Sequence, residues 1–235
     1  MAIYAISDLH LALSADKPMD VFGERWQNYM QRIKQHWQQE IKPDDCVVLP
    51  GDISWAMQLK EAYKDFEYLN QLAGLKIISK GNHDYWWETV NKLEKYVREH
   101  TFHKMHFLHN SSFLYNGWGI CGTRGWICPN EDHFTKQDEK IYNRELQRLE
   151  RSILHAQIFS PSKMLVALHY PPVNRRKDMT SGFVTMLKKY EIDVCIYGHL
   201  HGDSHQDALQ GIHEGIAFQL VSADFLEFKP FKITM

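Results

Sequence analysis

Acidic, histidine and asparagine side chains follow short apolar runs at five points in this chain. The runs are 2–6, 46–49, 76–78, 164–168 and 194–197, and the polar residues after them are Asp8 and His10, Asp52, Asn82 with His83 and Asp84, His169, and His199 with His201. The ends of several strands can meet at one point of a rigid scaffold. The pattern therefore predicts a metal centre assembled from distant parts of the chain.

The spacing within these clusters also suits metal binding. Asp8 and His10 are two residues apart, and residues two apart on an extended chain point to the same side. The candidates exceed the coordination of one ion and suit two divalent ions that share a carboxylate: Asp8, His10, Asp52, Asn82, His169, His199 and His201. Mixed imidazole and carboxylate ligands favour manganese, iron, zinc or nickel over magnesium or calcium.

These residues carry a family resemblance that spans residues 8 to 201. The sequence resembles the five-motif signature of the calcineurin-like metallophosphoesterases, through Asp8-Leu9-His10, Gly51-Asp52, Gly81-Asn82-His83-Asp84, His169 and Gly198-His199-Leu200-His201. The resemblance implies a two-sheet αββα sandwich that hydrolyses a phosphoester. It also implies a bridging Asp52, with Asp8, His10 and His201 completing one metal site and Asn82, His169 and His199 completing the second.

The residues after Asn82 are expected to supply acid–base chemistry. In a two-metal site the cations clamp the phosphoryl oxygens and lower the pKa of a bound water, and a metal-bridging hydroxide would attack phosphorus in line with the leaving group. His83 is not a ligand in the family pattern, so we expect it to protonate the leaving oxygen. We expect Asp84 to orient His83 through a hydrogen bond; the alternative is an N-cap for the following helix.

Other residues near the motifs are candidates for substrate contact. Arg124 lies in a loop after a predicted strand, where its guanidinium could bind a phosphate oxygen; the alternative is a surface arginine or a pair with an acidic neighbour. The run Arg175-Arg176-Lys177 is typical of a solvated surface, although it would attract polyanions if it faced the site. Tyr85 or Trp87 could stack on a base, but core packing is the favoured interpretation.

Amphipathic stripes between the apolar runs predict the elements that position these clusters. Apolar residues recur at helical spacing over 26–37, 59–69, 86–97 and 142–153, the last within a helix predicted over 138–157. Strands and helices alternate in the first half, segment 105–127 is typical of hairpins, and the tail beyond 203 is typical of further strands. This order favours an α/β fold with two sheets flanked by helices, as a single metallophosphoesterase domain over residues 1–235.

The bulk composition fits one ordinary globular domain. The chain has 235 residues, 44% hydrophobic and 24% charged, with a formal net charge of −2. This charge gives no long-range attraction to nucleic acid or membranes, and no apolar stretch approaches the roughly 18 residues that span a bilayer. We find no signal peptide and no C-x-x-C pair, and we expect Cys46 and Cys195 to be buried thiols in a cytoplasmic protein.

The leading interpretation is a metal-dependent phosphoesterase that acts on a small substrate. The alternatives are a phosphodiesterase or nuclease on nucleotides or nucleic acid, a protein phosphatase, and a non-catalytic scaffold that retains the fold. A nuclease needs a basic groove, which the net charge does not favour, and the complete motifs do not favour a scaffold. The sequence does not fix the substrate, the choice of monoester or diester, the native metal or the oligomeric state.

Overall fold

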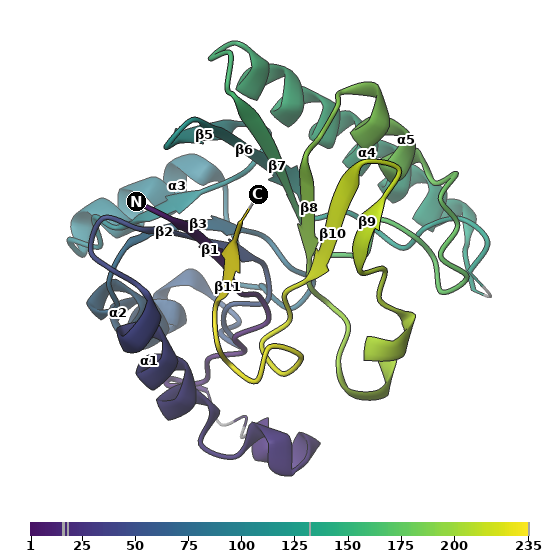
Figure 1. Ribbon diagram of the computed structural model, residues 1–235. Helices are drawn as coiled ribbons and strands as arrows, with labels where there is room; N and C mark the ends of the chain where they lie inside the picture. Colours follow the sequence, from purple (N-terminus) through teal and green to yellow (C-terminus); the bar gives the residue numbers. More distant parts are fainter. Residues whose placement is uncertain (16, 18, 132, 235) are drawn as a thin grey trace.

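The computed structural model describes residues 1–15, 17, 19–131 and 133–234, and two β-sheets form its centre (Figure 1). The five-stranded sheet has the order β11 (Phe231–Ile233), β1 (Ile3–Ala5), β2 (Cys46–Pro50), β3 (Leu75–Ser79) and β4 (Met105–Phe107). The six-stranded sheet has the order β5 (Ser112–Tyr115), β6 (Trp118–Thr123), β7 (Lys163–Leu168), β8 (Val194–Tyr197), β10 (Ile216–Leu220) and β9 (Gly211–His213).

α-Helices cover the outer face of each sheet (Figure 1). The five-stranded sheet packs against α1 (Tyr29–Glu40), α2 (Tyr63–Gln71) and α3 (Val90–Glu99), and the six-stranded sheet against α4 (Lys136–Gln157) and α5 (Gly182–Lys189). Short 3-10 helices lie before α1 (η1, Met19–Phe22, and η2, Glu24–Trp26), before α2 (η3, Leu59–Ala62) and after β8 (η4, Gly202–Asp207). The layers therefore follow the order α, β, β, α.

The central strands are buried on both faces, which explains why they are continuous apolar runs. On β2, Val48 points into the core between the sheets, while Val47 belongs to the core beneath α1 to α3. On β7, Leu165 points into the core between the sheets and Val166 faces α4 and α5. Alternate residues along each strand thus join different layers of the sandwich.

Parallel pairing brings the carboxyl ends of the central strands to one edge of the molecule. β1 to β4 are parallel in one sheet, and β6, β7, β8 and β10 are parallel in the other. A parallel bridge between Ser7 and Ser222 joins the two sheets just beyond the ends of β1 and β10. The clusters after β1, β2, β3, β7 and β8 therefore meet at this edge.

The structure confirms the predicted two-sheet αββα sandwich and corrects several details. The segment around Met105 is the parallel strand β4 and not part of a hairpin, although β5 and β6 do form one. The N-cap of α3 is Thr89, so Asp84 is not its cap. Helix α5 was not predicted. All four cysteines are buried and free, and no helix in the described part of the chain is both long and apolar enough to cross a membrane.

A lysine lies inside the outer core of the five-stranded sheet. Lys76 on β3 is fully buried, its ammonium donates a hydrogen bond to the carbonyl of Leu72, and its nitrogen lies 5.7 Å from the ring centroid of Trp37. Burial, together with the charge of Lys104, lowers the pKa of Lys76 to about 7. The folded state therefore binds this proton less tightly than the unfolded chain does.

We expect Lys76→Met to increase the free energy of unfolding, and most strongly at pH 7 and below. Between pH 7 and about 10 the unfolded wild type holds the proton that the folded protein releases, so wild-type stability rises with pH by up to about 1.4 kcal/mol per pH unit. The advantage of the variant should shrink over this window in urea titrations. Lys232→Met, at an exposed position on β11, is the control; a pH-independent advantage for Lys76→Met would contradict the assignment.

Candidate metal centre

The predicted ligand residues meet at the edge where the parallel strands end. Ligand atoms of Asp8, His10 and His201 all lie within 4.8 Å of one another, and so do those of Asp8, Asp52 and His169. These side chains come from the ends of β1, β2, β7 and β8, so both sheets contribute. The structure thus brings five of the seven predicted ligands close together. Below, the first group means Asp8, His10 and His201, and the second group means Asn82, His169 and His199.

The first group brings two imidazole nitrogens and a carboxylate together. Nε2 of His201 lies 3.3 Å from Oδ1 of Asp8 and 3.4 Å from Nε2 of His10. Two ring nitrogens that face each other with a carboxylate beside them offer three lone pairs to one point. This is the arrangement that a transition-metal ion needs.

The second group is built around the side-chain oxygen of Asn82. This Oδ1 lies 2.6 Å from Nε2 of His169 and 2.9 Å from Nδ1 of His199. Oδ2 of Asp52 lies 3.5 Å from Nε2 of His169 and 3.9 Å from Nε2 of His10. Asp52 therefore stands between the two groups, where a bridging carboxylate would be.

Hydrogen bonds behind the histidines orient their rings. Nδ1 of His169 lies 3.0 Å from the carbonyl oxygen of Pro50, and Nδ1 of His201 lies 2.8 Å from Oδ1 of Asp224. A ring N–H directed at either acceptor leaves the Nε2 lone pair pointing into the cluster. On α1, the hydroxyl of Tyr29 donates to the carbonyl of His10 at 2.7 Å, which fixes the backbone of that loop.

The backbone at the strand ends adopts an unusual conformation. Positive φ angles in the left-handed region occur at four candidate ligands: Asp8 (57°), His10 (46°), Asp52 (53°) and His199 (74°). Residues other than glycine carry a strain of about 1–3 kcal/mol in such regions and persist there only when the surrounding structure imposes it. The strain is therefore concentrated where the side chains must turn toward one another.

Glycines in the motifs make room for the carboxylates. A Cβ on Gly81 would collide with Oδ1 of Asp52, and a Cβ on Gly198 would collide with Oδ2 of Asp8. Because glycine has no Cβ, the backbone of the neighbouring strand end can lie close to each acidic side chain. This close approach lets hydrogen bonds form: the amide of His199 donates to Oδ2 of Asp8 at 3.1 Å, and that of His83 to Oδ1 of Asp52 at 2.8 Å.

The prediction that Asp84 accepts a hydrogen bond from His83 is wrong. Asp84 is fully buried and accepts from the backbone amides of Gly81 at 2.7 Å, Ile53 at 2.8 Å and Asp52 at 2.9 Å, and from the indole of Trp86 at 3.0 Å. In the described part of the chain, Nδ1 of His83 is buried without a hydrogen-bond partner. Asp84 therefore positions the loop of Asp52 rather than the imidazole next to it.

Burial sets the protonation of three histidines in the cluster. It lowers the pKa of His10 and of His199 to about 3 and that of His169 to about 4. These imidazoles are neutral at pH 7 and keep a lone pair, which is the form that binds metal. Burial also lowers the pKa of His83, which stands half-buried beside the cluster.

The carboxylates crowd one another. Burial raises the pKa of Asp52, and the charges of Asp8 and Asp84 raise it further. Burial would also raise the pKa of Asp8, but its hydrogen bond and charge interaction with His201 lower it. Burial would lower the pKa of His201, but hydrogen bonds with Asp224 and Asp8 raise it to about 10. The cluster therefore holds an excess of buried acidic groups that a cation would neutralise, so the donor set fits divalent metal.

Sequence reasoning missed Asp224, which lies after the carboxyl end of β10. Its buried carboxylate contacts Nδ1 of His201, accepts from the amide of Gly202 at 3.1 Å, and lies 3.2 Å from Nε2 of His205 and 3.6 Å from the guanidinium of Arg25. The signal was present, because Asp224 follows an apolar run just as the other clusters do. It positions His201 and does not itself face the second group.

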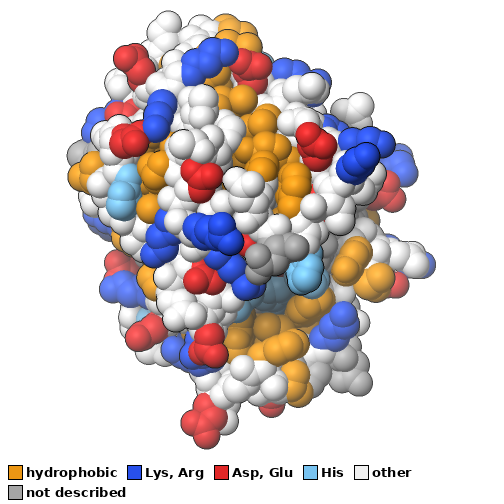
Figure 2. Space-filling model, turned by 90° about the vertical axis from the view of Figure 1, so that its right-hand side faces the viewer, with side chains coloured by type: hydrophobic (Ala, Val, Ile, Leu, Met, Phe, Trp, Pro, Cys, Tyr) orange, Lys and Arg blue, Asp and Glu red, His pale blue; other side chains and the backbone are white. Residues whose placement is uncertain are grey.

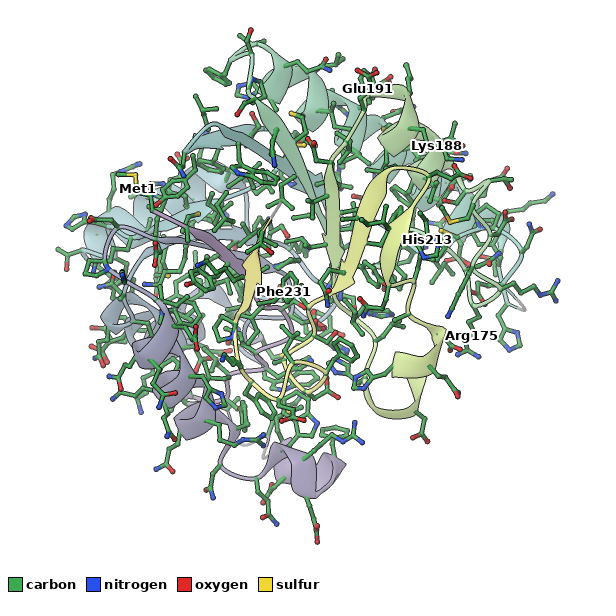
Figure 3. All side chains as sticks on the ribbon, in the orientation of Figure 1. Met1, Arg175, Lys188, Glu191, His213 and Phe231 are labelled. Atoms are coloured by element: carbon green, nitrogen blue, oxygen red, sulfur yellow. The ribbon has the colours of Figure 1, made fainter. Side chains whose placement is uncertain are left out.

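Arg124, the predicted substrate contact, and Arg175, in the run expected to be solvated, both have local partners. The guanidinium of Arg124 lies 4.0 Å from Glu145, which fits the alternative of a pair with an acidic neighbour. It also packs 4.4 Å from the ring centroid of Trp126. Arg175 is exposed beside η4, 3.9 Å from Asp207 (Figure 3). It also lines a cavity of about 460 Å³ that reaches His199. The segment 175–177 is therefore exposed to solvent, as predicted, but borders the site.

The candidate metal centre is open to solvent on one side. Figure 2 shows a hollow with histidine side chains at its base and hydrophobic side chains along its lower margin. A cavity of about 480 Å³ is lined by His10, His83 and His201, among others. A small molecule can therefore reach the predicted ligands and His83 together.

The chain belongs to the calcineurin-like phosphoesterase family, whose model matches residues 1–203. This confirms the resemblance seen in the sequence. Members usually bind two divalent metal ions, and the Asp and His groups described above could hold metal. No curated protein matches the chain.

Solved structures show the same fold at low sequence identity. The phosphopantetheinyl hydrolase of Mycobacterium tuberculosis matches with a TM-score of 0.54 and 12% identity, over 99% of this chain and 95% of that chain. A Thermus thermophilus protein matches with a TM-score of 0.50 and 12% identity, over 87% and 85%. A protein of unknown function from Aquifex aeolicus matches with a TM-score of 0.49 and 19% identity, over 98% of this chain and 95% of that chain. The first two likenesses concern the fold alone.

We expect Asp84→Asn to destabilise the protein, because an amide NH₂ would replace an acceptor that faces several backbone N–H groups. The free energy of unfolding should fall by at least about 2 kcal/mol, since hydrogen bonds to a buried charge are the costly ones to lose. Urea titration measures this. The control Asp44→Asn, at an exposed turn, should change it by less than about 0.5 kcal/mol; equal effects of the two variants would refute the role of Asp84.

We expect Asp224→Asn to weaken metal binding while preserving the fold. The amide oxygen can still accept from His201, but the lost charge makes the imidazole a poorer ligand, and such changes typically reduce metal affinity about 10–100-fold. Calorimetric titration with Mn²⁺ gives the affinity and stoichiometry. Asp203→Asn, on an exposed residue of η4, should change the affinity less than about 2-fold; wild-type affinity in Asp224→Asn would rule out the positioning role.

Proposed function

We propose that this protein hydrolyses a small phosphoester with two divalent metal ions and with His83 assisting the leaving group. The observation that carries the proposal is the convergence of Asp8, Asp52 and the surrounding imidazoles beside an open cavity that also contains His83. The family supports hydrolysis of a phosphoester. Nucleic acid is not proposed as the substrate, because the net charge of −2 provides no general attraction for it.

The proposed ligand assignment follows the two groups of side chains. Asp8, His10 and His201 would hold one ion, Asn82, His169 and His199 would hold the other, and Asp52 would be shared by both. Manganese, iron, zinc or nickel suits this mixture of imidazole and oxygen donors. Bound ions of this kind neutralise phosphoryl charge and lower the pKa of water, so that water can attack phosphorus at neutral pH.

His83 is the proposed acid for the leaving oxygen. Its ring centroid lies 5.8 Å from that of His10 and 4.7 Å from that of Trp55, so it borders the cluster without joining it. Its amide is fixed by the hydrogen bond to Asp52. A substrate whose phosphoryl group lay beside His10 would present its leaving oxygen toward this imidazole. The protonated form of His83 would donate the proton that the departing alkoxide requires.

We expect His83→Ala to retain its metals and to lose at least about 10²-fold in kcat, the usual contribution of a general acid. The assay is hydrolysis of p-nitrophenyl phosphate and of bis-p-nitrophenyl phosphate by metal-stripped protein reloaded with manganese, nickel, zinc or iron. Elemental analysis gives the metal content. The ester that is preferred separates a monoesterase from a diesterase.

Asp52→Asn is the companion variant, because removal of a bridging charge should release metal instead of slowing a loaded enzyme. Wild-type turnover by metal-loaded His83→Ala would eliminate His83 as the acid. Full metal content in Asp52→Asn would count against the bridge. No turnover of either ester with any metal, despite two bound ions, would favour the scaffold interpretation.

A further inference from the structure

An apolar wall stands beside the candidate metal centre. We use this name for Met19, Phe22, Trp26 and Trp55, which line the 480 Å³ cavity together with His83 and the histidines of the first group. Three of these side chains come from η1 and η2, in the segment between β1 and α1, and Trp55 follows the Asp52 loop. The hydrophobic margin of the hollow in Figure 2 lies on this side of the histidines.

Contacts at its base hold the apolar wall in place. The ring of Trp55 stacks on that of His10 with centroids 4.9 Å apart and an angle of 22°, and its Nε1 lies 3.1 Å from Sδ of Met19. Trp26 is buried, with its ring edge-on to that of Phe228 at 5.2 Å. Trp55 and Trp26 are therefore held in fixed positions at the base of the wall, and the exposed ring of Phe22 is the aromatic face that a ligand could cover.

The rim of the cavity combines an exposed ring with positive charge. Phe22 is 65% exposed although it is a large apolar side chain, so much of its ring faces water in the free protein. The ammonium of Lys17 lies 4.3 Å from the ring centroid of Trp55, and Arg25 also lines the cavity. An aromatic ligand that carries a phosphoryl group would cover Phe22 and meet these cations.

We propose that this cavity binds a flat aromatic ring in the alcohol part of the substrate, which makes aryl or nucleoside phosphoesters the substrate class. The inference rests on the proposed function, because His83 and the first group of histidines line the same cavity. The alcohol part of a phosphoester bound at these histidines would therefore extend into this cavity. The apolar wall then selects among alcohols, while the strand ends supply the chemistry.

The test compares ligands that differ only in the ring and that contain a stable carbon–phosphorus bond. Calorimetry of the full chain, with and without Mn²⁺, measures binding of phenylphosphonate and methylphosphonate. The wild type should bind the phenyl compound at least about 5-fold more tightly, the lower end of what one stacked ring contributes. Phe22→Ala should lose most of this preference and leave methylphosphonate binding within about 2-fold, whereas Phe22→Tyr should retain it.

Val21→Ala is the matched control, because Val21 is 72% exposed, precedes Phe22 and does not line the cavity. It should keep the wild-type preference. Equal affinities of the wild type for the two phosphonates, or equal losses in Val21→Ala and Phe22→Ala, would overturn the inference. Ester turnover without ring preference would defeat this inference alone, and ring preference without turnover would defeat the proposed function alone.

Discussion

The whole site depends on holding the carboxylates of Asp8 and Asp52 close together and out of water. Ligand atoms of the two residues lie within 4.8 Å of each other, and both residues are buried. Two like charges at such a distance repel strongly in a medium of low dielectric constant. The neutral histidines around them add lone pairs and no positive charge, and only His201 has its pKa raised. A cation bound between the carboxylates would relieve this repulsion, and the Asp and His groups could hold one.

The sandwich supplies the rigidity that this repulsion demands. Asp8 is held by the hydroxyls of Ser7 and Ser222 and by the amide of His199, so residues from both sheets restrain one carboxylate. Asp52 is restrained by the amide of His83, which donates to its carboxylate, and by the buried Asp84, which accepts from the backbone amide of Asp52. The left-handed backbone at the strand ends is maintained by the same contacts. The sheets therefore hold both carboxylates in fixed positions.

The fold and the metal cluster were predictable because they depend on patterns local in sequence. Buried parallel strands are short apolar runs, and their carboxyl ends meet, so Asp8, Asp52 and His169 could be grouped without coordinates. Asp84 was misjudged because adjacency to His83 does not tell where a side chain points after a tight turn. The partner of Arg124, Glu145, lies one helix away in α4, and Asp224 reaches His201 from the next strand in space. Contacts of this kind depend on packing between elements, which no local pattern encodes.

The candidate ligands and the apolar wall stand on different kinds of structure in this molecule. The candidate ligands stand on strand ends that neighbouring strands, the motif glycines and buried hydrogen bonds restrict, so few substitutions are compatible with them. Met19 and Phe22 belong to short 3-10 turns before α1, and Phe22 packs against little else. A change there alters the cavity without disturbing the cluster. The family fold can therefore keep one set of candidate ligands while the segment before α1 changes the cavity beside them.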